Sequence, residues 1–109
     1  MSFDFDKEDI NRYFVDNYEC WYCGKNGAYS LHHTHPRSDV IKCSSSLFNC
    51  SPVHNYPCHL DNHGLLCTDE WRRKLLRKTA RFLFQQHIKL KDIDKQFLFD
   101  NRKALLDIK

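Results

Sequence analysis

Histidine and cysteine crowd into one part of this 109-residue chain. Six of the seven histidines lie in the stretch from Leu31 to His63, and Cys20 and Cys23 come shortly before it. Histidine is the commonest metal ligand in proteins, and it takes up protons near neutral pH. Core packing does not account for this crowding, so we expect the stretch to bind metal ions.

Cys20 and Cys23 are separated by two residues and followed at once by Gly24. A glycine at this place lets the backbone fold back so that both thiolates face one ion, as in a zinc knuckle. A redox dithiol is the alternative, but such a pair begins a helix after a βαβ-type strand, and the sequence before Cys20 has no such strand. The pair therefore predicts a structural zinc.

The remaining ligands of a tetrahedral zinc must come from further along the chain. His54 and Cys58 are best placed, because three residues separate them on the far side of the predicted strands. Cys50 competes with His54 for the third position. Cys43 and Cys67 are then left over, and lone cysteines usually serve as small buried apolar residues.

Four other histidines predict a second, open metal site. Neighbouring residues on a strand point to opposite faces, so His32 and His33 cannot both bind one ion in a regular strand. His59 and His63 are four residues apart and would share one face of a helix. One strand histidine together with these helix histidines leaves coordination positions for water and phosphate, as catalysis requires.

Short elements must position these residues. Their apolar spacing and turn residues predict a helix over 7–17 capped by Asp6 or Asp9, strands over 29–35 and 38–43, an irregular segment over 47–53, and a helix from Cys58 that ends at Gly64. Thr68 then caps a long helix over 69–88, and a second helix follows over 92–107. These two helices are expected to form a hairpin over the metal module.

Length and composition limit the alternatives. The chain is long enough for one domain, and its net charge of +3 gives weak support for a nucleic-acid partner. It has no apolar run near 18 residues, which argues against a membrane span. The acidic and aromatic start is unlike a secretory signal, so we expect a cytoplasmic protein, in which paired cysteines bind metal or act in redox chemistry.

Residues 19–66 resemble the HNH endonuclease family, whose fold is called ββα-metal. The first motif reads Leu31-His32-His33-Thr34-His35-Pro36, and the second begins at Asn49 and runs through His54 to Cys58-His59. His54 stands where many members have cysteine, and three residues instead of two precede Cys58. The resemblance implies a small ββα-metal core with a structural zinc. Together with the helices expected from apolar spacing, this predicts an α+β fold in which an N-terminal helix over 1–18 and a helical hairpin over 67–109 flank the core.

The resemblance also implies a role for individual residues. His33 corresponds to the general base that activates water, and His32 and His59 to ligands of the catalytic divalent ion. Asn49 corresponds to the asparagine that orients the base histidine through backbone contacts, and His63 to a helix residue that helps to hold metal or phosphate. The zinc-bearing branch implies a structural site on Cys20, Cys23, His54 and Cys58.

An HNH endonuclease hydrolyses phosphodiester bonds of DNA, by nicking or by double-strand cleavage, with Mg²⁺, Mn²⁺, Ni²⁺ or Co²⁺. His32 replaces the commoner aspartate. An imidazole is a softer ligand than a carboxylate, so this replacement favours Mn²⁺, Ni²⁺ or Co²⁺. The resemblance implies a phage or mobile-element setting, with a homodimer or a phage DNA-processing partner. The alternatives are a non-catalytic zinc module that binds DNA or protein, and a redox dithiol protein.

Histidines and basic residues outside these motifs have simpler interpretations. We expect His35 to face solvent and His87 to be structural, near the end of a helix. A basic run on the helix over 69–88 is either the solvated face of an amphipathic helix or a phosphate-binding surface. Because most of the net charge lies there, we favour DNA binding by Arg72, Arg73, Lys74, Arg77, Lys78 and Arg81.

Overall fold

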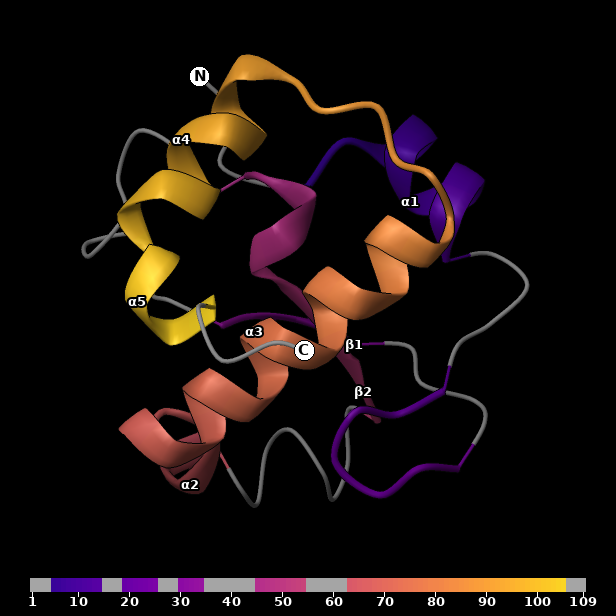
Figure 1. The fold of residues 1–109 in the computed structure, drawn as a ribbon. Coiled ribbons are helices and arrows are strands. Elements are labelled where there is room, and N and C mark those ends of the chain that lie inside the picture. The colour runs from indigo at the N-terminus through magenta and orange to yellow at the C-terminus, as the bar shows by residue number, and fades with distance from the viewer. Residues whose placement is uncertain (1–4, 15–18, 26–29, 35–44, 55–62, 106–109) are drawn as a thin grey trace.

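The computed structural model describes residues 5–14, 19–25, 30–34, 45–54 and 63–105. These residues form a small mixed domain of helices and one two-stranded antiparallel sheet, which agrees with the predicted α+β class. In Figure 1, helix α3 runs across the middle of the molecule, with α4 and α5 on one side and α1 near its C-terminal end. None of the described helices combines the length and the apolar character needed to span a bilayer.

The sheet pairs β1 (Ser30–His33) with β2 (Cys50–Val53). A strand was predicted around β1, but β2 corrects the prediction of an irregular segment, and the 3₁₀ helix η1 (Leu47–Asn49) leads directly into it. Pro52 lies within β2 and donates no ladder hydrogen bond. In a two-stranded sheet every strand is an edge strand, so this loss is tolerated. The other predicted strand, over 38–43, lies outside the described residues.

Helix α1 (Lys7–Tyr13) is capped as predicted by Asp6, whose carboxylate accepts the backbone N–H groups of Glu8 and Asp9. The helix ends at Tyr13, and its C-cap residue, Phe14, is fully buried. The Phe14 ring stacks on Phe82 of α3 with a centroid separation of 5.0 Å. This contact attaches α1 to the C-terminal half of α3.

Helix α3 (Asp69–Gln85) begins at the predicted cap, where Thr68 Oγ1 accepts the Trp71 N–H. Its buried face is formed by residues at helical spacing: Leu75, Leu76, Thr79, Ala80 and Leu83. The helix ends three residues before the predicted limit of 88. The chain turns at His87, where φ is 56° and an α-helix cannot continue.

Two further helical predictions need correction. The expected helix over 92–107 is divided into α4 (Asp92–Asp100) and α5 (Arg102–Leu105). At the break, the Asn101 side-chain amide donates to the Phe97 carbonyl, a local bond that competes with continued helix. Gly64 does not end a helix, because α2 (His63–Leu66) continues past it to the fully buried Leu66.

Candidate metal centre

A tight turn places the first two cysteines. The Gly24 N–H donates to the Cys20 carbonyl, and the Cys20 N–H donates to the Lys25 carbonyl, both at 2.9 Å. Gly24 has a φ of 78°, a left-handed conformation that glycine adopts without a Cβ clash. The predicted knuckle is therefore present, and the glycine has the role that its position indicated.

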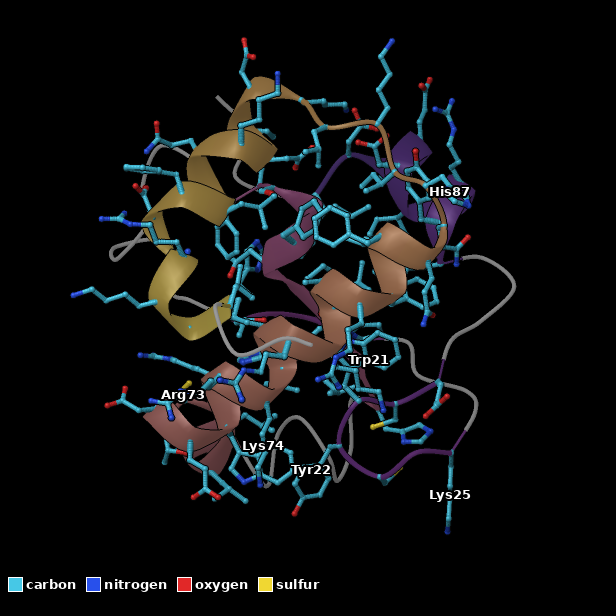
Figure 2. All side chains as sticks on the ribbon, in the orientation of Figure 1. Trp21, Tyr22, Lys25, Arg73, Lys74 and His87 are labelled. Carbon is cyan, nitrogen blue, oxygen red and sulfur yellow. The ribbon has the colours of Figure 1, made fainter. Side chains whose placement is uncertain are left out.

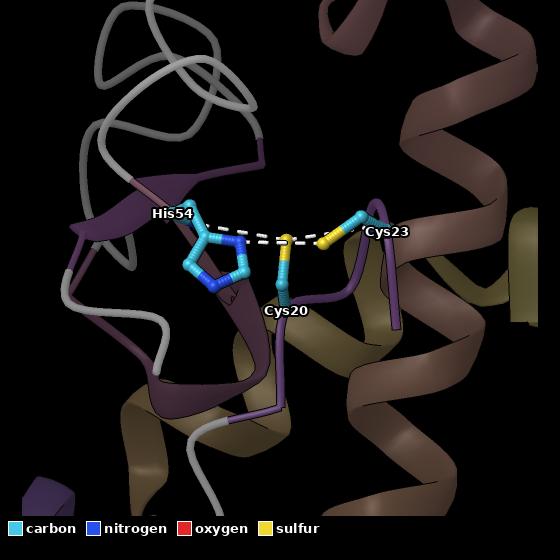
Figure 3. Close-up of side chains that lie close together, drawn as sticks. All are labelled: Cys20, Cys23 and His54. Carbon is cyan, nitrogen blue, oxygen red and sulfur yellow. Dashed lines mark hydrogen bonds between the residues drawn. The ribbon is translucent and has the colours of Figure 1, made fainter. Parts of the chain in front are cut away.

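The knuckle lies against the end of β2, and this brings His54 to the cysteines. The Trp21 N–H donates to the Pro52 carbonyl at 2.8 Å, which fixes the turn two residues before His54. The donor atoms of Cys20, Cys23 and His54 all lie within 4.8 Å of one another (Figure 3). His54 Nδ1 is 3.3 Å from Cys23 Sγ.

The Cys20 sulfur is prepared to carry negative charge. Burial raises the pKa of this thiol. The backbone N–H groups of Cys23 and His54, each 3.5 Å from Sγ, together with the backbone of Tyr22 and the Cys23 side chain, outweigh burial. The pKa is lowered to about 7 from an ordinary value of 9.0. N–H groups directed at a sulfur stabilise the thiolate, which is the form that binds metal.

The donor set fits zinc. Two thiolates and an imidazole are ligand types that structural zinc prefers, and the three donor atoms, all within 4.8 Å of one another, are close enough to share one ion. The site can hold a zinc ion on Cys20, Cys23 and His54. The predicted fourth ligand, Cys58, lies outside the described residues.

Cys50 does not compete for this site. It is fully buried on β2, and burial raises the pKa of its thiol well above the usual range. A thiol that stays protonated is a poor metal ligand. Its backbone serves instead as an anchor, because the Thr79 hydroxyl donates to the Cys50 carbonyl at 2.7 Å.

A buried hydrogen-bond chain joins the knuckle to α3, and the sequence analysis missed it. Trp21 Nε1 donates to Thr79 Oγ1 at 2.8 Å, and the same hydroxyl donates onward to β2. Thr79 is fully buried among the apolar residues of α3. A lone polar residue within an apolar helical stripe was the signal that could have identified this link.

Comparisons with known proteins do not relate this site to a known family. No family model matches the chain, and searches of curated proteins and of solved structures find no significant match. Its chemistry has to be inferred from its own residues.

The two strand histidines occupy opposite faces, as strand geometry predicted. His32 is 3% exposed and lies opposite Ser51, whereas His33 is half-buried and lies opposite Cys50. The His33 ring stacks on Phe5, with centroids 4.2 Å apart and an interplanar angle of 16°. One face of this imidazole is therefore covered by the segment before α1.

His33 also borders an open pocket of about 320 Å³. The pocket lies between β1 and α1, and its other lining residues are Phe5, Lys7, Ile10, Asn11 and Leu31. Backbone contacts fix the strand beside it, because the Thr34 N–H donates to the carbonyl of the buried Asn49 at 2.9 Å. Asn49 thus contacts the residue after His33 through its backbone carbonyl, and its role in orienting His33 stays a prediction.

The structure leaves several predicted site residues untested. His35, Cys43, Cys58 and His59 lie outside the described residues, and for His63 the structure gives only its backbone position at the start of α2. Cys67 is only partly buried. His87 was expected within the last turn of a helix, and this prediction was wrong, because α3 ends at Gln85. His87 is exposed, has a positive φ and lies beside α1 in Figure 2.

The predicted basic residues do not share one surface. Lys74, Arg77, Lys78 and Arg81 line a groove of about 680 Å³ beside the knuckle. Arg73 is exposed on the same helix but does not line the groove, and in Figure 2 it and Trp21 lie on opposite sides of α3. Arg72 is half-buried and also lies outside the groove lining.

Proposed function

We propose that this chain is a metal-dependent HNH-type endonuclease that hydrolyses phosphodiester bonds of DNA. The observation that carries the proposal is the position of His33, which borders an open pocket beside a strand pair anchored by Asn49. A zinc on the nearby cysteine knuckle, completed by Cys58, would stabilise this small fold.

The proposed reaction needs a base and a means of stabilising charge. His33 accepts a proton from a water molecule, whose oxygen attacks phosphorus while the bond to the leaving oxygen breaks. Histidine takes up and releases protons near neutral pH, which suits this role. A divalent ion, when bound, neutralises the charge that develops on the phosphate and on the leaving oxygen. We assign its ligands to His32, His59 and His63.

The proposed donor set predicts the metal preference. Imidazole ligands favour transition metals, whereas Mg²⁺ prefers oxygen donors. We therefore expect Mn²⁺, Ni²⁺ or Co²⁺ to support cleavage at least as well as Mg²⁺. The test is incubation of zinc-loaded protein with supercoiled plasmid DNA and each ion in turn, followed by gel analysis of nicked and linear products.

Two results would contradict the proposal in different ways. Cleavage supported by Mg²⁺ alone would contradict the assigned ligand set. Absence of cleavage with supercoiled, linear, single-stranded and branched DNA under all four ions would contradict the nuclease function itself.

A non-catalytic zinc module that binds nucleic acid is the second candidate. The nearly complete burial of His32 and the stacking of Phe5 on His33 favour it, because both limit access to the histidines. The two candidates differ in one outcome of the plasmid experiment: a binding module retards DNA in the gel without producing nicked or linear forms.

A further inference from the structure

One groove of the molecule is lined by positively charged side chains and by aromatic rings that are largely buried. The groove beside the knuckle receives four cationic side chains from α3 and one carboxylate, that of Glu19. Its cations are Lys74, Arg77, Lys78 and Arg81. The charge balance of the lining residues is therefore clearly positive.

The four cations follow one line along the helix. Residues 74, 77, 78 and 81 have the spacing of a single helix face, and at a rise of about 1.5 Å per residue they span roughly 10 Å. One strand of duplex DNA carries a charge about every 3.4 Å along the helix axis. The row is therefore long enough to reach several consecutive phosphates of one strand.

Contacts with neighbouring segments hold two of these cations in place. Arg77 Nε donates to the Ala104 carbonyl of α5 at 3.0 Å. Lys78 Nζ lies 3.3 Å from the Glu19 carboxylate and 4.9 Å from the centre of the Trp21 ring. A cation that is already positioned loses less conformational entropy when it binds a phosphate.

The floor of the groove is unsuited to base stacking. Trp21 is only 6% exposed, and Phe82 is half-buried with its ring stacked on Phe14. Proteins that bind single strands offer exposed aromatic faces on which bases stack. The charges of this groove are accessible and its aromatic rings are largely covered, which favours the phosphate backbone over the bases.

We propose that this groove binds the phosphodiester backbone of duplex DNA without reading base sequence, and that the Glu19 carboxylate weakens this binding. The inference rests on the proposed function, which supplies DNA as the substrate. It identifies where the substrate backbone lies, beside the knuckle on α3.

The experiment measures DNA affinity by fluorescence anisotropy over a range of salt concentrations, in a His33→Ala background. Labelled duplex and single-stranded oligonucleotides of one sequence are compared. Arg81→Gln should weaken duplex binding about three- to tenfold at low salt and reduce the slope of log affinity against log salt by about 0.9. Arg73→Gln is the matched control, because it removes the same charge from the same helix outside the groove, and it should change neither value appreciably.

Glu19→Gln distinguishes an electrostatic effect of this carboxylate from a structural one, because the loss of a merely structural contact would not strengthen DNA binding. Removing this carboxylate should tighten duplex binding about threefold at low salt, and the gain should fade as salt screens the charges. Equal losses from Arg73→Gln and Arg81→Gln, a preference for the single strand, or weaker binding by Glu19→Gln would overturn the proposal.

The His33→Ala background separates this proposal from the nuclease proposal. If that protein still cleaves DNA, the assigned base is wrong, whereas the binding data still report on the groove. If cleavage depends on His33 but Arg81→Gln leaves duplex affinity unchanged, the groove proposal alone fails.

Discussion

The cysteine knuckle and the histidine strand show how differently two chemical motifs are positioned. The knuckle gathers Cys20 and Cys23 through a turn of its own and receives one ligand, His54, from β2. In the strand, His32 and His33 are adjacent in sequence, but the pleat sends them to opposite faces. A turn brings its own side chains together, whereas a strand needs other segments to complete a site on either face.

The comparison also separates two kinds of burial. The Cys20 side chain has no exposed surface, yet N–H groups directed at its sulfur stabilise the thiolate and lower the pKa of the thiol. Cys50 lies deeper in the protein, and burial alone raises the pKa of its thiol. Depth and the local backbone together decide which cysteine can bind metal.

The largest expected effect comes from removing a knuckle ligand. Cys23→Ser should reduce bound zinc from about one ion per chain to nearly none, because a structural site that loses one thiolate binds zinc much more weakly. Metal analysis after dialysis, together with thermal unfolding, measures the loss. Cys67→Ser is the matched control and should keep its zinc, whereas zinc retained by Cys23→Ser would show that the metal is held elsewhere.

The second prediction concerns pH and the same site. Because the pKa of Cys20 is about 7, protons compete with zinc for this sulfur as the pH falls below 7. Zinc affinity should fall at least about tenfold per pH unit there, from this ligand alone. Competition with a chromophoric chelator measures the change, and an affinity independent of pH between 5 and 7 would contradict it.

The metal-free chain should show the corresponding trend in stability. The Cys20 thiol has a lower pKa in the folded chain than the ordinary value of 9.0 that applies to the unfolded chain. Its thiolate therefore stabilises the folded state fully above pH 9.0, and this contribution is lost as the pH falls through about 7. The Cys20 contribution to the free energy of unfolding should therefore increase from pH 7 to pH 9. Comparing the wild-type chain with Cys20→Ser, both without metal, isolates this contribution.

The third prediction tests the link between the knuckle and α3. Thr79→Val keeps the shape of the side chain but leaves Trp21 Nε1 and the Cys50 carbonyl without this hydroxyl. Each buried polar group that loses its partner costs about 1–3 kcal/mol, so the free energy of unfolding should fall by roughly 2–6 kcal/mol. Thr79→Ser, which retains a hydroxyl, is the control in a denaturant titration, and equal losses would assign the effect to packing.

The smallest expected effect is in the segment that covers His33. Asp6→Ala removes the cap of α1, next to the Phe5 ring that stacks on His33, and should cost about 1 kcal/mol. Glu8→Ala, at an exposed position in the same first turn, should cost less. Denaturant titration of both variants tests the difference, and equal stability would remove the capping role of Asp6.

The sequence predicted features that depend on local chemistry. The knuckle followed from two cysteines and a glycine, and the start of α3 followed from Thr68 and its acidic first turn. The sequence did not reveal β2, since Pro52 disfavours a strand unless the sheet has only two strands. It also did not reveal the turn at His87 or the break at Asn101, because each depends on a backbone conformation or a local hydrogen bond that residue type alone does not specify.

The most direct test of the account measures DNA cleavage and zinc content on the same sample of His33→Ala. We predict that cleavage of supercoiled plasmid falls at least about 100-fold, the usual contribution of a general base, while zinc content and unfolding temperature stay close to wild type. His87→Asn, at an exposed position whose positive φ asparagine tolerates, should behave like wild type in all three measurements. Undiminished cleavage by His33→Ala would contradict the central claim that this imidazole activates water beside a separate, structural zinc.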